Sequence, residues 1–179
     1  MTEQELIKGC IDKRRDYQKL LFDRYSGKMM SVCLRYANDE NRAQDILQEG
    51  FIKVFGYIHQ YRFDGSFEGW MRRVFVSVAT RQLSKEKILF TDVDLSNDAY
   101  TSIDPSVVSK ISEDEIHLMI RSLPEGYRTV FNLAVIEGYS HEEIAAMLDI
   151  QPTTSRGQLL KARKYLQALI LKKYNTVRI

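Results

Sequence analysis

The sequence has little of several residue types on which whole classes of protein depend. Among 179 residues there are two cysteines, three histidines and three prolines. Cys10 and Cys33 stand alone, without a CxxC spacing or a neighbouring histidine, so neither a disulfide framework nor a zinc site is predicted. Strand-like alternation is absent and apolar residues recur every three or four positions, so both halves of the chain are expected to be helical.

Long apolar runs and targeting segments are also missing. No run approaches the roughly 18 residues that a membrane span needs. The first residues, MTEQELIKGC, lack the basic and apolar regions of a signal peptide. We therefore expect a soluble, cytoplasmic chain without direct membrane insertion. Because the net charge is only +2, any nucleic-acid role must come from where the charges lie.

The motifs of common enzymes are absent as well. There is no GxxxxGK[ST] phosphate loop, no HExxH pair and no GxSxG elbow. The glycine-containing segment at residues 63–67 does not follow a strand, so it does not resemble a phosphate loop. We expect no catalytic residue, no metal site, no cofactor and no enzymatic activity.

One acidic segment interrupts the helical pattern. Residues 91–109 contain four aspartates and no lysine or arginine, together with serines, threonines and a proline. Such a composition is typical of a linker. The sequence therefore predicts an all-α protein of two small helical domains, residues 1–90 and 113–179, joined by a flexible acidic linker over residues 91–112.

The last fifty residues have the spacing of a helix-turn-helix. Ser140 and Glu143 form a capping box before an apolar helix face. Residues 149–151 form a short break, and Pro152 suits the first turn of the next helix. From Ile150 onward there is no Asp or Glu, against seven Lys and Arg. Because phosphates repel carboxylates and guanidinium groups read guanine edges, this helix favours DNA binding over a solvated basic face.

The N-terminal half contains a loop rich in aromatic and basic residues. Three arginines lie close to four aromatic side chains around residues 64–66, namely Tyr61, Phe63, Phe67 and Trp70. Aromatic faces beside cations suit unstacked single-stranded bases. The alternative is that the rings belong to the hydrophobic core, and for Trp70 and Phe75 both interpretations remain open.

Three stretches together resemble the extracytoplasmic-function group of bacterial RNA polymerase sigma factors. They are DILQEGFIKVF, FDGSFEGWMRRV and, after a variable linker, LPEGYRTVFNLAVIEGYSHEEIAAML followed by TTSRGQLLKARKYL. The resemblance covers roughly residues 17–88 and 113–170. In that family the first domain binds the polymerase clamp and opens the −10 promoter element, and the second reads the −35 element as a duplex.

The resemblance implies partners and roles for individual residues. The partners are core RNA polymerase, promoter DNA and an anti-sigma factor, often membrane-anchored. The polymerase contact falls on Asp45, Gln48 and Glu49. The residues expected at the −10 element are Phe63, Asp64, Ser66, Phe67, Trp70, Arg73, Ser77, Thr80 and Arg81. Those expected at the −35 element are Thr153, Thr154, Arg156, Gly157, Leu160, Lys161, Arg163 and Lys164.

Four positions depart from the pattern of that family. Ser77 stands where the family usually has Asn, and Ser155 replaces a buried Val. Ser155 should loosen the core unless its hydroxyl bonds a carbonyl one turn earlier. Asp149 stands where Gly is common, and Asp tolerates the left-handed conformation better than most residues. Gly157 costs the helix up to about 1 kcal/mol relative to Ala, and close approach of its backbone to a base is the expected compensation.

Two other functions compete with the sigma-factor interpretation. One is a helix-turn-helix repressor or activator that acts without binding polymerase core, and the other is an adaptor that binds only protein. The aromatic and basic loop and the polar stripe at residues 45–49 argue against the first. The acid-free terminal helix argues against the second. We expect an alternative sigma factor that directs promoter-specific transcription initiation.

Overall fold

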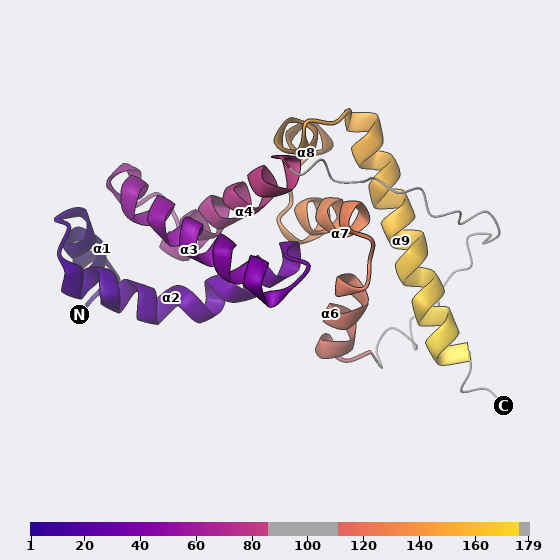
Figure 1. Ribbon diagram of the computed structural model, residues 1–179, viewed down its shortest axis with the longest axis horizontal. Coiled ribbons are helices and arrows are strands. Elements are labelled where there is room, and N and C mark those ends of the chain that lie inside the picture. The colour runs from indigo at the N-terminus through magenta and orange to yellow at the C-terminus, as the bar shows by residue number, and fades with distance from the viewer. Residues whose placement is uncertain (86–110, 176–179) are drawn as a thin grey trace. The chain divides into compact units, whose positions relative to one another are not determined.

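The structure, a computed structural model, describes residues 1–85 and 111–175 (Figure 1). These residues form helices and connecting turns, with no strand among them. They belong to two compact units, Met1–Glu86 and Lys87–Ile179. The all-α class and the two-part layout are confirmed. The acidic segment at residues 91–109 lies outside the described residues.

Helices α2, α3 and α4 pack against one another to form the body of the first unit. Its elements are α1 (Glu3–Ile11), α2 (Arg15–Tyr36), α3 (Glu40–Tyr57), the 3-10 turn η1 (Ile58–Gln60) and α4 (Phe67–Lys85). The apolar periodicity of α3 predicts a core that includes Ile46, Phe51 and Val54, and all three side chains are buried. Leu47 and Phe55, also expected in the core, are only half-buried.

The break between α2 and α3 is shorter than the sequence indicates. The polar run at residues 38–41 predicts a break in the helical pattern, but α3 already begins at Glu40. Asp39 is the cap, and its carboxylate accepts a hydrogen bond from the backbone N–H of Arg42 at 2.8 Å. A side-chain acceptor at this position satisfies one of the unpaired donors of the first turn, which lets the helix start within the polar run.

Helices α3 and α4 approach closely at Gly50. A Cβ atom at this position would lie 2.2 Å from a ring carbon of Phe75 on α4. Farther along the same pair of helices, the side-chain amide of Gln82 donates a hydrogen bond to Glu49 at 2.8 Å. The register between α3 and α4 therefore depends on two neighbouring positions of α3. Gly50 has no side chain to keep the helices apart, and Glu49 forms a polar contact with α4.

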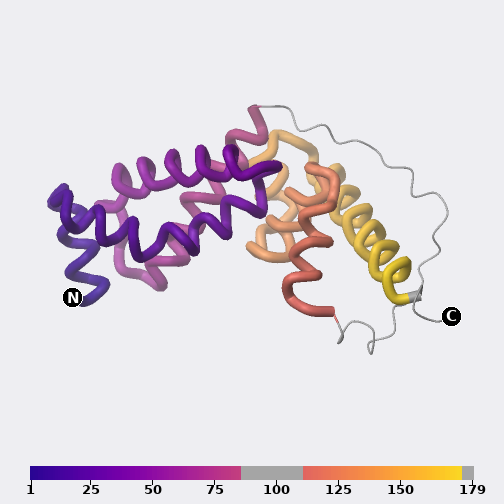
Figure 2. Tube along the Cα trace, turned by 60° about the horizontal axis from the view of Figure 1, so that its bottom comes forward, coloured from indigo at the N-terminus to yellow at the C-terminus, as the bar shows by residue number. Residues whose placement is uncertain are grey.

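In the second unit, α9 packs along the other helices, as Figure 2 also shows. The elements are α6 (Glu113–Arg121), α7 (Glu125–Phe131), the π-helical turn η2 (Asn132–Ile136), α8 (His141–Leu148) and α9 (Pro152–Asn175). Ile120, Leu123, Tyr127 and Ala162 form a buried apolar cluster. This cluster fixes which side of α9 faces inward.

The helix-turn-helix has the local structure that its sequence predicts. The backbone N–H of Ser140 donates to the Glu143 carboxylate at 2.7 Å, and the Glu143 N–H donates to the Ser140 hydroxyl at 3.2 Å. Asp149 ends α8 in the left-handed conformation, with φ 55° and ψ 50°. Helix α9 begins at Pro152. Among the described residues, no helix combines the length and hydropathy that crossing a bilayer requires.

Candidate nucleic-acid interfaces

Helix α9 presents half of the predicted −35 residues as one outward row. Thr153, Arg156, Leu160 and Arg163 are exposed and lie three or four positions apart, which places them on one face of a helix. Leu160 is 44% exposed although it is apolar. Thr154, Gly157, Lys161 and Lys164 are half-buried and flank this row.

The opposite face of α9 is buried. Ser155, Gln158, Leu159 and Ala162 each have less than a tenth of their surface exposed. The two faces separate as the sequence predicts. No acidic residue occurs anywhere on α9, so the outward row is a neutral and basic surface. Such a surface suits the phosphate-lined major groove of DNA.

Arg156 is tied to the preceding helix by an ion pair that the sequence did not reveal. Its Nη2 atom donates to the Glu142 carboxylate at 2.6 Å, and both side chains are more than half exposed. Glu142 lies in the first turn of α8. The pair therefore joins the two helices of the helix-turn-helix at the outward face of the motif.

Ser155 has a different partner from the one its helical position suggests. The side chain is fully buried, and its Oγ lies 2.9 Å from Nδ1 of His141, the first residue of α8. The bond to a carbonyl one turn earlier, which was the condition for keeping the core tight, is thus replaced by a side-chain contact between helices. A buried hydroxyl with a hydrogen-bonding partner avoids most of its desolvation cost. This contact explains how a serine occupies a core position of α9.

In the first unit, the loop between η1 and α4 is organised by Tyr61. The buried Tyr61 ring packs against the rings of Phe63 and Phe67, and its hydroxyl donates to the carbonyl of Gly65 at 2.7 Å. Phe63 is 42% exposed and has a φ of 61°, a conformation that is rare for a bulky residue. Asp64 and Ser66 are also exposed. The loop therefore offers one aromatic ring, two polar side chains and the guanidinium group of Arg62 to solvent.

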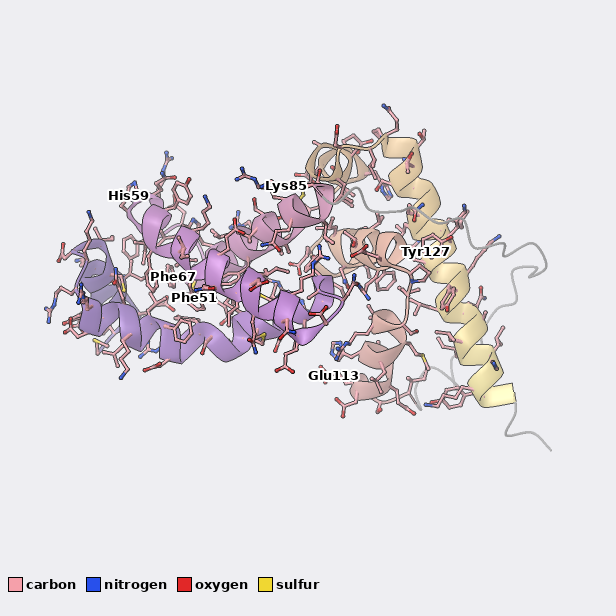
Figure 3. The ribbon with its side chains drawn as sticks, viewed as in Figure 1. Phe51, His59, Phe67, Lys85, Glu113 and Tyr127 are labelled. Atoms are coloured by element: carbon pink, nitrogen blue, oxygen red, sulfur yellow. The ribbon has the colours of Figure 1, made fainter. Side chains whose placement is uncertain are left out.

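Phe67, by contrast, is a core residue. Its side chain is 1% exposed, and Figure 3 shows it pointing inward between the helices of this unit. Its ring stacks on that of Trp70 at a centroid distance of 5.6 Å and meets the edge of Tyr25 at 5.8 Å. No face of the Phe67 ring is accessible here, so the ring supports the loop from the core, and its contact with an unstacked base stays a prediction.

Thr80, also predicted at the −10 element, lies on the buried side of α4. Its side chain is 2% exposed, and its hydroxyl donates to the carbonyl of Val76 at 2.8 Å. On a helix, position 80 shares a face with residues 76 and 83, both of which are buried. Thr80 therefore lies in the core of this unit, and its place at the −10 element stays a prediction. Phe75, which was left open between core and surface, is fully buried.

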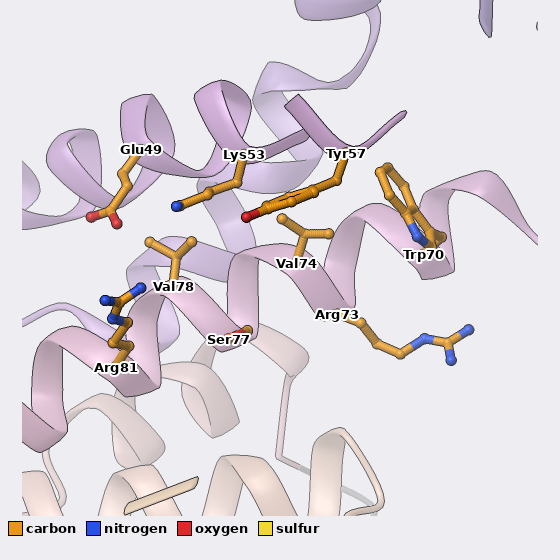
Figure 4. Close-up of a pocket in the computed structure, with 9 residues that line it drawn as sticks. All are labelled: Glu49, Lys53, Tyr57, Trp70, Arg73, Val74, Ser77, Val78 and Arg81. Atoms are coloured by element: carbon orange, nitrogen blue, oxygen red, sulfur yellow. The ribbon is translucent and has the colours of Figure 1, made fainter. Parts of the chain in front are cut away.

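The remaining predicted residues of α4 line a pocket against α3. Trp70, Arg73, Ser77 and Arg81 follow one another at spacings of three and four. The pocket has a volume of about 470 Å³ (Figure 4). The other lining residues are Glu49, Lys53, Tyr57, Val74 and Val78.

Lys53 and Tyr57 are the polar members of this pocket that the sequence reasoning missed, and its apolar members Val74 and Val78 were expected only in the core. In Figure 4 both side chains extend from α3 over the apolar floor made by Val74 and Val78. The sequence feature that could have identified them is their spacing. Glu49, Lys53 and Tyr57 follow one another at four-residue intervals, which puts them on one face of α3. The pocket thus combines two aromatic rings with three cationic side chains and one carboxylate, that of Glu49. That chemistry suits an anionic strand with an unstacked base.

The predicted polymerase-binding residues do not form one surface. Asp45 and Gln48 are exposed, and Ile52, one turn further along α3, is 63% exposed. Glu49 instead turns toward α4, where it accepts the hydrogen bond from Gln82. Asp45, Gln48 and Ile52 form an exposed ridge along α3. Next to Asp45, α2 and α3 form a largely apolar groove of about 380 Å³, which Gln48 and Ile52 also line. The groove is lined by Phe22, Gln44, Leu47, Gln48, Phe51, Ile52 and Phe55.

The cysteines provide no reactive centre. Burial raises the pKa of Cys33 to about 12 and, with a contribution from Asp16, that of Cys10 to about 11. Both side chains are therefore protonated thiols at neutral pH. Within the part of the chain that the structure describes, no group of three His, Cys, Asp or Glu residues could hold a metal ion.

Comparisons with known proteins match both units. The family model described as Sigma-70 region 2 matches residues 21–88, and that described as Sigma-70, region 4 matches residues 113–166. The ECF RNA polymerase sigma-E factor of Salmonella typhimurium LT2 is 30% identical over 176 residues, covering 92% of each chain. The RNA polymerase sigma-H factor of Pseudomonas aeruginosa is 27% identical over 180 residues, covering 92% of this chain and 93% of the other.

A solved structure of CnrH in complex with the cytosolic domain of CnrY is 19% identical, with a TM-score of 0.49, and covers 94% of this chain and 96% of that one. The region 2 match accounts for the N-terminal unit, which a repressor or a protein-only adaptor would not require. The chain belongs to the extracytoplasmic-function sigma factors of the sigma-70 family, which are not enzymes but alternative sigma factors that direct transcription initiation.

Proposed function

We propose that this sigma factor divides promoter recognition between its two units. Helix α9 reads the −35 element as a duplex, and the loop at residues 61–66 together with α4 holds the opened −10 strand. The observation that carries the proposal is the outward row on α9. It places four exposed side chains at helical spacing on a helix without a single acidic residue.

At the −35 element, reading and positioning belong to different residues of α9. Arg156 lies in the first turns of the helix, where side chains reach base edges, and its guanidinium group suits a guanine. The exposed Leu160 suits the methyl group of a thymine. Arg163 and Lys164 lie further along the helix and contact phosphates. Phosphate contacts position the helix but carry no sequence information themselves.

At the −10 element, the contacts with DNA come from the loop at residues 61–66 and from the pocket between α3 and α4. The exposed ring of Phe63 provides a surface on which an unstacked base can lie. Its left-handed backbone supports this role, since strained non-glycine residues cluster at functional sites. In the pocket, Lys53 and Tyr57 of α3 join the predicted residues of α4. Trp70, Arg73 and Arg81 complete the binding surface.

The polymerase contact falls on the exposed ridge of α3 formed by Asp45, Gln48 and Ile52. Glu49 contributes by holding α3 to α4 through Gln82. The groove shares Gln48 and Ile52 with this ridge and, with its exposed Phe22, suits a second protein partner. On the basis of family membership, this partner is an anti-sigma factor. The proposed partnership with core RNA polymerase places the protein in the cytoplasm.

Two substitutions in α9 test the proposed −35 contacts. Arg156→Ala should cost about 1–3 kcal/mol of binding free energy at the preferred −35 sequence and much less at altered ones. Arg163→Ala should weaken binding to all −35 sequences alike and lower the salt dependence by about one counterion. The measurement is the binding of holoenzyme to a set of −35 variants at two salt concentrations.

The two substitutions serve as controls for each other. Both remove an exposed cation from the same helix, so only their sequence dependence separates them. A uniform loss of affinity for Arg156→Ala would show that this residue contacts phosphate. Holoenzyme that binds every −35 sequence equally well before any substitution would overturn the proposal for α9 as a whole.

A further inference from the structure

The ion pair between Glu142 and Arg156 places a carboxylate beside a helix that has none of its own. Oε1 of Glu142 accepts a hydrogen bond from Nη2 of Arg156 at 2.6 Å. Both side chains are exposed, at 65% and 54% respectively, so the pair lies on the outer surface of the motif. An isolated exposed pair adds little to stability. Its place next to the outward row of α9 indicates a role in recognition instead.

We propose that Glu142 determines −35 specificity by acting through Arg156. The inference rests on the proposed reading role of Arg156, and it adds a residue outside the recognition helix. Glu142 itself contacts no base in this arrangement. It is a positioning residue for the guanidinium group and a source of repulsion toward the DNA backbone.

The positioning effect follows from the geometry of the guanidinium group. Arginine presents five N–H donors in a planar fork, and Glu142 contacts one of its terminal nitrogens. Donors on the rest of the fork can still face a guanine edge. Because the ion pair restricts a long side chain before DNA arrives, less conformational entropy is lost when the base contact forms.

The ion pair also limits what Arg156 can gain at sequences that it does not match. Phosphates repel the Glu142 carboxylate at every sequence alike, so this repulsion lowers all affinities and does not discriminate by itself. At an altered sequence, however, the carboxylate holds the guanidinium group away from phosphates that it would otherwise bind at any sequence. Specificity can arise in this way from a cost imposed on the wrong partner.

The substitution Glu142→Gln tests the inference, because it removes the charge and nearly keeps the shape. In holoenzyme, the ratio of affinities for the preferred −35 sequence and for sequences altered at the base that Arg156 reads should fall about two- to fivefold, the range expected for an exposed ion pair. Most of this change should come from tighter binding to the altered sequences. In an Arg156→Ala background, Glu142→Gln should shift all sequences alike.

Asp114→Asn is the matched control. It neutralises another exposed carboxylate of the same unit, in the first turn of α6, and should leave the −35 preference unchanged. If Arg156→Ala relaxes the preference but Glu142→Gln shifts every sequence equally, the inference is wrong and the proposed function stands. If Arg156→Ala does not relax the preference, the reading role fails and the inference fails with it.

Discussion

Phe63 and Phe67 lie four positions apart in one segment, yet their environments are opposite. Phe63 is 42% exposed, whereas Phe67 is 1% exposed and stacks on Trp70. Both had been assigned to the −10 site by their position in a shared motif. At the scale of single residues, burial therefore separates a ring that can meet a base from a ring that supports the loop.

Alanine substitutions at these two positions should affect different properties, namely the stability of the unit at Phe67 and promoter opening at Phe63. Phe67→Ala should destabilise the first unit by about 3–5 kcal/mol, because it leaves a cavity in the core. Phe63→Ala should change stability by less than about 0.5 kcal/mol and should slow the formation of open promoter complexes. Trp70 is the only tryptophan of the chain, so its fluorescence reports the unfolding of this unit.

A promoter already mismatched across the −10 region separates base capture from polymerase binding. Holoenzyme with Phe63→Ala should recover much of its activity on this template, because melting is no longer required. An equal loss on duplex and mismatched templates would show that Phe63 acts before promoter opening.

At the scale of secondary-structure elements, the −10 pocket depends on how closely α3 and α4 pack. Gly50 allows the Phe75 ring to lie against the α3 backbone, and Gln82 bonds to Glu49 one residue before it. Lys53 and Tyr57 reach the pocket only because α3 keeps this register relative to α4. A change at the crossing should therefore affect both stability and the binding surface.

Gly50→Ala should destabilise the first unit by about 1–3 kcal/mol, since an added methyl group collides with Phe75. Gly56→Ala on the same helix is the control, because nothing lies within 4 Å of a Cβ there. That control should be neutral or stabilise the unit by up to about 1 kcal/mol. Denaturant unfolding followed by Trp70 fluorescence measures both. Equal effects of the two substitutions would show that α3 and α4 are not in close contact at Gly50.

At the scale of the whole molecule, the proposed contacts with the two promoter elements belong to separate compact units. On this proposal, polymerase binding is needed to set the distance at which the −10 and −35 elements are read together. The ridge of Asp45, Gln48 and Ile52 is the proposed contact on the first unit. Its loss should therefore disable promoter recognition even when both units remain folded.

Asp45→Lys should weaken the affinity for core RNA polymerase while changing the stability of the first unit by less than about 0.5 kcal/mol, because Asp45 is exposed. Asp12→Lys, an exposed charge reversal at the end of α1, is the control and should leave the affinity unchanged. Titration of labelled protein with core polymerase gives both affinities. If Asp45→Lys binds as tightly as the control, the ridge is an ordinary solvated surface.

The sequence by itself determined the helical class, the two-part layout and the limits of the helix-turn-helix. These features depend on local chemistry. The capping box of Ser140 and Glu143, the left-handed Asp149 and Pro152 at the start of α9 each act within a few residues. The spacing of the motifs also determined the family, because this spacing can be read along the chain without knowing how the helices pack.

Only the tertiary structure decided which side chains of the candidate sites are accessible and which are paired. The burial of Phe67 and Thr80 depends on the helices that cover them. Glu49 meets Gln82 across 33 positions of sequence, and Glu142 meets Arg156 across 14. Helical periodicity states which residues share a face, but only packing determines what that face meets.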